Sequence, residues 1–330
     1  MDKVLVAEIA PDIFKIEVPL PKTPLRITNS YYVRGGERGM LIDTGFNHLL
    51  CREAMTEALE RLDVDMNRTD LFITHLHSDH AGLSRFLAKP GTRVFMSEAD
   101  GKVVAAGQHA DFWESFKKFY NFTGLYSGKY VTSVNDHPGY AYAPPASDDF
   151  IFVEDGHEFA VGQYTLRCIL TKGHTRGHLC LYEPERKFLF SGDHILGKIT
   201  PNITLMSFDH DALEEYLASL DVIDALELEN VYPGHRHAIG DAHGRIRQLK
   251  EHHAQRLEEV MAIIGEKRLN TVEVTRAMRW SLTIENWEDY PPAQKLFSAG
   301  EALAHLHYLA RRDKLVMDEG EDGLVYFSRK

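Results

Sequence analysis

One feature constrains this chain more than any other: three histidines and an aspartate fall within six residues, in the run THLHSDH at residues 74–80. The run follows a short apolar stretch that is typical of a buried strand. Side chains two residues apart on an extended segment point the same way, so His75 and His77 can reach one ion. Asp79 and His80 lie at the predicted turn into the next helix, where they can face a second ion. Imidazole and carboxylate ligands together suit zinc, iron or manganese.

Three later segments repeat this arrangement, in which a predicted strand ends in a short loop that contains glycine and a candidate metal ligand. They are GHTRGH at 173–178, SGDH at 191–194 and PGH at 233–235. Glycine lets the backbone turn sharply, so that a side chain can point back over the end of a sheet. The candidate ligands are His174, Asp193 and His235. A histidine-rich surface loop is the alternative interpretation of the first run, and these downstream partners argue against it.

The pattern of apolar residues predicts a layered α/β architecture. Alternation from Val4 to about Tyr32 predicts a meander of strands, after which strands alternate with helices, including one at His48 to about Leu62 and one at Ala81 to Leu87. Strands are predicted again at 150–153, 164–170, 179–182, 187–191 and 230–232, with a helix at about 211–226 before the last of them.

The character of the chain changes after Gly244. Helices are expected at 246–264, 271–278 and 297–311, followed by a β-hairpin, an order that resembles a winged-helix module. Thr271 is the expected N-cap of the second helix, without a capping box, because Val274 stands three residues later. We therefore predict a catalytic domain at 1–244 and a C-terminal helical, winged-helix-like domain at 245–330. The second is expected to be a structural appendage or to form a homodimer.

Residues from about 100 to 149 form an aromatic-rich insert. Its aromatic residues are Phe112, Trp113, Phe116, Phe119, Tyr120, Phe122, Tyr126, Tyr130, Tyr140 and Tyr142. One interpretation is a pair of helices with a small core of its own. The other is a lid or a wall that faces the substrate, because long loops in compact domains are often functional. The two interpretations are compatible.

Composition narrows the classes of function. The formal net charge is −12, with 49 acidic and 37 basic side chains, which disfavours non-specific nucleic-acid binding through Lys and Arg. The three cysteines form no Cys-x-x-Cys pair, which fits a reducing cytoplasm. No apolar run approaches the roughly 18 residues of a spanning helix, and the N-terminal residues do not match a signal peptide. We expect a cytoplasmic protein without a membrane partner.

The motifs, taken in order, resemble the metallo-β-lactamase superfamily. They are DTG at 43–45, HxHxDH at 75–80, GHTxGH at 173–178, SGD at 191–193 and PGH at 233–235, and the resemblance spans residues of about 10 to 240. It implies an α/β fold, a four-layer αβ/βα sandwich, with a metal site at one edge of its two sheets.

The resemblance also implies a set of ligands and a chemistry. The first metal ion would be held by His75, His77 and His174, and the second by Asp79, His80 and His235, with Asp193 as the bridge. Asp43 would support the site by hydrogen bonding rather than by ligation. Two divalent ions, for which zinc is expected and iron or manganese are alternatives, activate a shared water as hydroxide. Asp79 is the catalytic candidate, because it can orient that hydroxide.

A serine or cysteine nucleophile is not needed, and the sequence offers no convincing one. Cys168 and Cys180 lie in predicted apolar strands and are expected in the core. His178 is expected to support its loop rather than to bind metal, and His237 is expected at the surface. The pairs at 252–253 and at 305 and 307 lie on predicted helices and are not expected to form metal sites.

Two branches of the superfamily fit best: the glyoxalase II-like enzymes and the intracellular β-lactamase-like proteins, some of which act on RNA. The first hypothesis is a hydrolase of a small-molecule thioester, ester or lactone. The second is a nuclease that cleaves RNA or DNA phosphodiesters and uses the C-terminal module as a binding arm. Net charge and the acidic turn at 318–323 favour the small-molecule substrate. An iron-dependent oxidoreductase at the same ligands is a further alternative.

Overall fold

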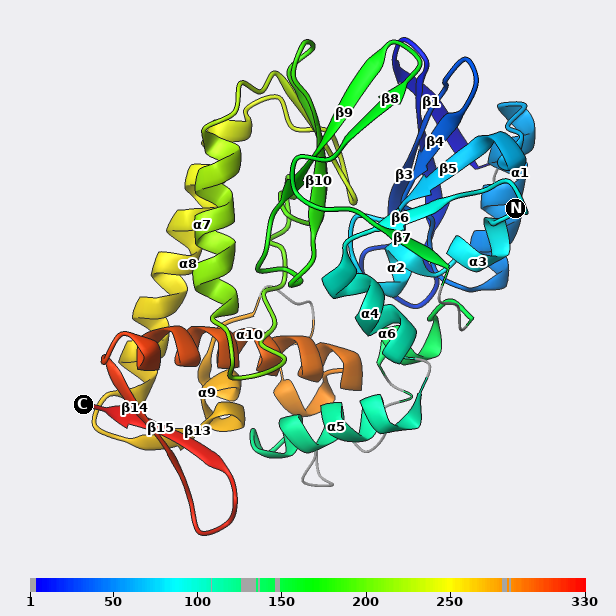
Figure 1. Ribbon diagram of the computed structural model, residues 1–330. Coiled ribbons are helices and arrows are strands. Elements are labelled where there is room, and N and C mark those ends of the chain that lie inside the picture. The colour runs from blue at the N-terminus through cyan, green and yellow to red at the C-terminus, as the bar shows by residue number, and fades with distance from the viewer. Residues whose placement is uncertain are drawn as a thin grey trace.

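Two sheets pack face to face, with helices on both outer faces, in the computed structural model of the chain (Figure 1). The structure describes residues 4–107, 109–125, 135, 137–145, 149–280, 284 and 286–330. Helices and a small third sheet follow at the C-terminal end. The predicted four-layer αβ/βα sandwich with a C-terminal helical extension is confirmed.

The first sheet contains seven strands in sequence order from β1 to β7. They are β1 (Leu5–Ala10), β2 (Ile13–Pro19), β3 (Ile27–Val33), β4 (Gly39–Ile42), β5 (Thr69–Phe72), β6 (Val94–Met96) and β7 (Phe150–Phe152). Strands β1 to β4 pair antiparallel, which confirms the predicted meander, and β4 to β7 pair parallel. Parallel neighbours need a crossover, and α1 (Leu49–Arg61), followed by the short 3₁₀ helix η1 (Met66–Arg68), forms the one from β4 to β5.

The second sheet has the order β12-β11-β10-β9-β8. Its strands are β8 (Glu158–Val161), β9 (Tyr164–Leu170), β10 (Leu179–Glu183), β11 (Phe188–Gly192) and β12 (Asn230–Pro233). Strands β11 and β12 run parallel, and α7 (Ala212–Asp224) connects them. Strand β8 was not predicted, because its alternation of exposed and buried residues extends over only four positions.

The inner faces of the two sheets form one buried apolar cluster. It joins Ile42 and Phe72 of the first sheet to Leu181 and Phe190 of the second. The rings of Tyr31 and Phe190 meet across it with centroids 5.0 Å apart. Each large side chain buried in this way contributes about 1.5–3 kcal/mol. This core fixes the sheets against each other, and so fixes the loops at their common edge.

The region that follows β5 differs from the prediction. The single helix expected at 81–87 is two short helices, α2 (Ser78–Ala81) and α3 (Ser84–Leu87). Asp79 and His80 therefore lie in the first turn of a helix rather than before it. Gly82 permits this close packing, since a Cβ there would lie 2.6 Å from the carbonyl oxygen of Gly45.

The described residues of the aromatic insert form three α-helices between β6 and β7. They are α4 (Glu98–Ala106), α5 (Ala110–Asn121) and α6 (Pro138–Ala141). Trp113 and Phe116 of α5 join Leu296 of the C-terminal part in a separate apolar cluster. This core is shared with the C-terminal part, so the prediction that the insert has a core of its own is wrong. Tyr126 and Tyr130 lie outside the described residues.

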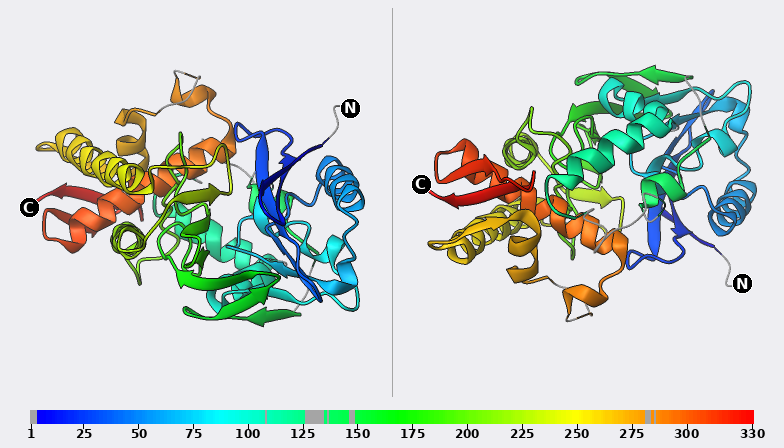
Figure 2. Two further views of the ribbon diagram at one scale, coloured as in Figure 1. Left: turned by 90° about the horizontal axis from the view of Figure 1, so that it is seen from above. Right: turned by 90° about the horizontal axis from the view of Figure 1, so that it is seen from below.

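The C-terminal part packs beside the second sheet, at the opposite end of the molecule from α1 (Figure 2). It contains α8 (Ala242–Ile264), β13 (Arg268–Asn270), α9 (Thr271–Ala277), the 3₁₀ helix η3 (Trp287–Asp289), α10 (Pro292–Arg311), β14 (Leu315–Glu319) and β15 (Val325–Arg329). The strands form a sheet of order β13-β15-β14. Three helices and a terminal hairpin match the predicted winged-helix-like order. The boundary between residues 244 and 245 stays a prediction.

Two details of this part correct the sequence analysis. The N-cap of α9 is Asn270 rather than Thr271, and it forms a capping box with Glu273. The prediction missed this box because it placed the start of the helix one residue too late. Strand β13 was also missed, since three residues carry too little pattern.

Among the described residues, none of the helices combines the length and the apolarity that a membrane crossing requires.

Candidate metal centre

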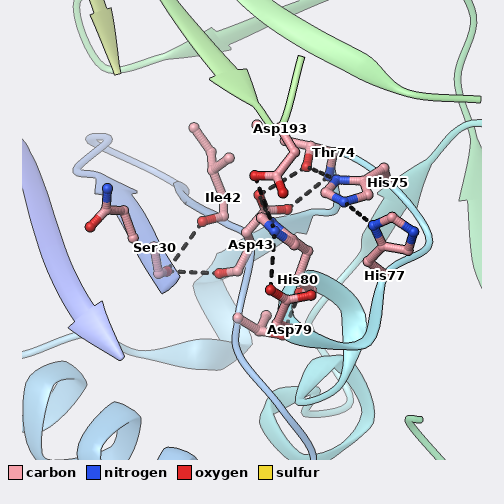
Figure 3. Close-up of polar contacts among 12 residues, drawn as sticks. Ser30, Ile42, Asp43, Thr74, His75, His77, Asp79, His80 and Asp193 are labelled. Atoms are coloured by element: carbon pink, nitrogen blue, oxygen red, sulfur yellow. Dashed lines mark hydrogen bonds and ion pairs between the residues drawn. The ribbon is translucent and has the colours of Figure 1, made fainter. Parts of the chain in front are cut away.

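Seven side chains from four loops meet at one edge of the two sheets. They are His75, His77, Asp79, His80, His174, Asp193 and His235, all of them the predicted site residues. The loops follow strands β5, β9, β11 and β12. Figure 3 shows five of these side chains turned toward one another. All seven are buried except His77, which is partly exposed.

Three imidazoles form the first group of candidate ligands. The Nε2 atom of His75 lies 3.1 Å from Nδ1 of His77 and 3.3 Å from Nε2 of His174. Burial, together with the neighbouring His174, lowers the pKa of His77 to about 3. The His77 ring is therefore neutral at physiological pH, and its lone pair is available to a cation.

The second group combines two imidazoles with a carboxylate. Oδ2 of Asp79 lies 3.2 Å from Nε2 of His235 and 3.7 Å from Nε2 of His80. Burial disfavours a charged imidazole, but the carboxylates of Asp193 and Asp79 outweigh it and raise the pKa of His235 to about 10. The negative charge of the two carboxylates thus favours a positive charge at this point.

Asp193 lies between the two groups. Its Oδ2 atom is 3.4 Å from Nε2 of His235 and 3.8 Å from Nε2 of His174, and its Oδ1 atom is 3.5 Å from Nε2 of His80. One carboxylate is therefore near histidines of both groups. This is the position that a bridging ligand needs.

Several buried atoms of the cluster lack hydrogen-bond partners. Nε2 of His80, Nε2 of His235 and Oδ1 of Asp193 are buried, and none of them forms a hydrogen bond with another described residue. Their contacts with one another and with Asp79, at 3.2–3.7 Å, are ion pairs. Buried polar atoms in folded proteins are normally paired. All three atoms are nitrogen or oxygen donors of the type that zinc prefers. Their lack of hydrogen bonds therefore fits a cation bound between them.

The other ring nitrogen of three histidines is held by a hydrogen bond. Nδ1 of His80 donates to Asp43, Nδ1 of His174 to the carbonyl of Asn202, and Nδ1 of His235 to the carbonyl of Ile27, at 2.7–2.8 Å. Such bonds fix the tautomer and leave Nε2 free to bind a metal.

Asp43 supports the site without joining either group of candidate ligands. Besides His80, its carboxylate accepts hydrogen bonds from the backbone and hydroxyl of Thr74, at 2.8 and 2.9 Å. Its own carbonyl accepts from Ser30 (Figure 3). These contacts match the supporting role that was predicted for Asp43.

The remaining histidines behave largely as expected. Nε2 of His178 accepts from the backbone of Asp193 at 3.1 Å, so His178 supports the loops of the site. His237 is exposed. His253 of α8 and His305 of α10 are buried and share a hydrogen bond of 3.1 Å. Within the described part of the chain, neither belongs to a group of three metal ligands.

Asp100 is a residue of the site that sequence reasoning missed. It is 1% exposed, and its Oδ2 accepts from the backbone of Leu76 and the hydroxyl of Thr175, at 2.9 and 2.6 Å. Its Oδ1 accepts from the backbone of Gly177 at 2.8 Å. Burial raises the pKa of Asp100 to about 6, against the effect of these hydrogen bonds. Asp100 thus ties the loop of His75 and His77 to the loop of His174.

We expect Asp100→Ala to lower the free energy of unfolding by about 3 kcal/mol or more, since three buried donors would lose their acceptor at about 1–3 kcal/mol each. Urea denaturation measures this loss. Asp111→Ala, at an exposed position of α5, is the matched control. Equal unfolding free energies for Asp100→Ala and the native protein would show that the hydrogen bonds of Asp100 are not needed for stability.

The cluster opens into a cavity of about 590 Å³. His77, Asp79, His174 and Asp193 are among the residues that line it. Its other walls include Phe112, Trp113 and Phe116 of α5, Trp280, and Phe297 of α10. The aromatic insert therefore also faces the cavity, as the second interpretation predicted.

Four cations also line this cavity: Lys198, Arg236, Arg256 and Arg279. Arg256 pairs with Glu259, and among the described residues the other three take part in no ion pair. A chain of net charge −12 thus places unpaired positive charge beside an apolar cavity.

Comparison with known proteins identifies the sandwich and the C-terminal part separately. The family model of the Metallo-beta-lactamase superfamily matches residues 23–235. The model of the Metallo-beta-lactamase-like C-terminal domain matches residues 288–330.

Curated relatives share about a quarter of their residues with this chain. The Beta-lactamase-like protein 2 homolog of Caenorhabditis elegans is 27% identical, over 76% of this chain and 70% of its own length. The acyl-coenzyme A thioesterase MBLAC2 of Homo sapiens is 26% identical, over 64% of this chain and 74% of its own. The thioesterase pkgB of Emericella nidulans is 27% identical over 73% of this chain, which spans only 55% of that relative. The match to the lactamase-like protein adaB of Aspergillus niger likewise covers only 61% of that protein.

Solved structures resemble almost the whole chain. A metallo-beta-lactamase family protein from Thermus thermophilus has a TM-score of 0.83 and 26% identity, with 98% of this chain and 100% of that one covered. A beta-lactamase domain protein from Burkholderia ambifaria has a TM-score of 0.80 and 24% identity, with 98% and 94% covered. The C-terminal extension is thus part of the shared fold.

Proposed function

Because this chain belongs to the metallo-β-lactamase superfamily of hydrolases, we propose that it hydrolyses a small-molecule thioester at a site for two divalent metal ions. One observation carries the proposal: four of the seven clustered candidate ligands, His77, Asp79, His174 and Asp193, line an apolar cavity of about 590 Å³. A cavity of this size is in the range of small-molecule sites.

The proposed ligand sets follow the geometry of the cluster. The first ion would be held by His75, His77 and His174, and the second by Asp79, His80 and His235, with Asp193 shared. Zinc suits these nitrogen and oxygen donors, and iron or manganese accept the same set. When bound, such a pair of ions polarises the scissile carbonyl and lowers the pKa of a shared water toward neutrality.

Asp79 would act on the water that attacks the carbonyl. Burial alone would raise its pKa, but His80 and His235 lower the pKa of Asp79 to about 2. The carboxylate therefore stays ionised and accepts a hydrogen bond from the water, which it orients rather than deprotonates. The same carboxylate lines the cavity, where an acyl group would bind.

The cavity walls favour a thioester among the substrates considered. Aromatic side chains from α5 and α10 suit an apolar acyl chain, and Lys198, Arg236 and Arg279 suit a leaving group with negative charge. Two of the relatives are named thioesterases, one of them an acyl-coenzyme A thioesterase. A nuclease would need a continuous basic track to neutralise the phosphate backbone.

A substrate panel tests the proposal. Native protein loaded with zinc should hydrolyse a medium-chain acyl-coenzyme A thioester with a kcat/KM above about 10⁴ M⁻¹s⁻¹, within the usual range for enzymes. A lactone and a phosphodiester should be much poorer substrates. Faster cleavage of the phosphodiester than of the thioester would contradict the proposal and favour the nuclease.

A further inference from the structure

We propose that the C-terminal helix α10 positions the metal ligand His174 through Asn202, which makes Asn202 and Glu301 positioning residues of the site. The inference rests on the proposed function, in which His174 holds a metal ion. It assigns the C-terminal part a role in the chemistry of the sandwich.

The series of contacts that connects His174 with α10 begins at the imidazole of His174. Its Nδ1 atom donates to the carbonyl oxygen of Asn202 at 2.8 Å. The corresponding partner of His235 is the carbonyl of Ile27, in strand β3, and that of His80 is Asp43, directly after β4. Asn202 instead lies in the connection between β11 and α7, outside any helix or strand. The backbone at Asn202 must therefore be held by other contacts.

The side chain of Asn202 provides those contacts. Its Nδ2 donates to Oε2 of Glu301 at 2.9 Å and to the carbonyl of Phe297 at 3.2 Å. Phe297 and Glu301 are four residues apart on α10, so both acceptors lie on one face of the helix. Asn202 thus joins His174 to one turn of α10.

The next residues of the connection are also fixed, to α10 through Gly300 and to α5 through Tyr120. The backbone of Leu205 donates to the carbonyl of Gly300 at 3.4 Å, and the hydroxyl of Tyr120 donates to the carbonyl of Leu205 at 3.1 Å. A Cβ at Gly300 would lie 2.6 Å from Cγ2 of Thr204, so only glycine allows this approach. The connection therefore cannot shift relative to α10 without breaking several contacts.

Glu301 is itself held in place by α8. It is 8% exposed, and its Oε1 lies 3.8 Å from Nε of Arg256. Arg256 is buried as well and donates to Glu259 at 2.6 Å and to the carbonyl of Arg279 at 2.7 Å. The acceptor that fixes Asn202 thus belongs to a buried network of the C-terminal part.

Zinc affinity, measured without substrate by competition with a chromophoric chelator, tests the inference. Asn202→Asp keeps the size of the side chain but turns its donor into an acceptor that faces Glu301. We expect this variant to bind one of the two ions about 10–100-fold more weakly, the range for partners that orient a metal ligand. In the double variant Asn202→Asp with Glu301→Gln, the amide at position 301 can donate to the carboxylate at position 202, which is the reverse of the native hydrogen bond. This double variant should therefore bind zinc more tightly than Asn202→Asp alone.

Arg312→Gln is the matched control. It removes a 2.9 Å contact between the C-cap of α10 and Asp211, the N-cap of α7, and none of the contacts that join His174, Asn202 and Glu301, so it should leave zinc affinity unchanged even if stability falls. Native affinity for both ions in Asn202→Asp, with native protein binding zinc, would overturn the inference and leave the proposed function standing. A native protein that binds no zinc would overturn both.

Discussion

Asp193→Ala is expected to lose tight binding of both metal ions and to lower kcat/KM by more than about 100-fold. That figure is the upper end for residues that only orient a ligand, and the Asp193 carboxylate is placed to be a ligand itself. It lies within 3.4–3.8 Å of ring nitrogens of His80, His174 and His235. Without it, five histidines would surround the cations with Asp79 as the single carboxylate of the proposed ligand set. Elemental analysis and thioester hydrolysis of the purified variant measure the two effects.

Asp209→Ala is the control for this variant. Asp209 is exposed and pairs with Arg176 at 2.9 Å, so its removal should leave metal content and kcat/KM at native values. Two ions per chain in Asp193→Ala, with native activity, would remove Asp193 from the site.

Asp79→Ala is expected to lower kcat by about 100-fold, the loss that can follow when a reacting group is no longer held in position. The carboxylate lies near His80 and His235 but is not among the ligand group of His75, His77 and His174. The variant should therefore keep one ion and bind the other weakly. This distinguishes it from Asp193→Ala, in which both ions are affected.

Single-turnover hydrolysis at saturating thioester, with excess zinc, separates the two roles of Asp79. Recovery of full activity in excess zinc would show that Asp79 only binds metal. Native activity without added zinc would remove Asp79 from the mechanism altogether.

Most of the candidate ligands could be predicted from sequence because they lie in loops that follow strands. His75 and His77 come just after β5, Asp193 after β11 and His235 after β12. Short apolar stretches predict such strands, and strand ends that meet at one edge bring their loops together. The order of the motifs then indicated the fold as well as the site.

Asp100 and Asn202 could not be predicted in the same way. Asp100 lies at the start of α4, where an acidic residue is ordinary, and its three donors come from loops that the sequence does not show as neighbours. Asn202 lies in an irregular connection, and its partner Glu301 is 99 positions away. Their roles depend on how the insert and the C-terminal part pack, which follows from side-chain shape rather than from periodicity.

The metal content of the native protein tests the central claim most directly. Protein purified without chelator and then dialysed against excess zinc should hold two ions per chain by elemental analysis. Hydrolysis of the acyl-coenzyme A thioester should disappear when both ions are removed and return when they are restored. A stoichiometry near zero, or full thioesterase activity in the metal-free protein, would contradict the account.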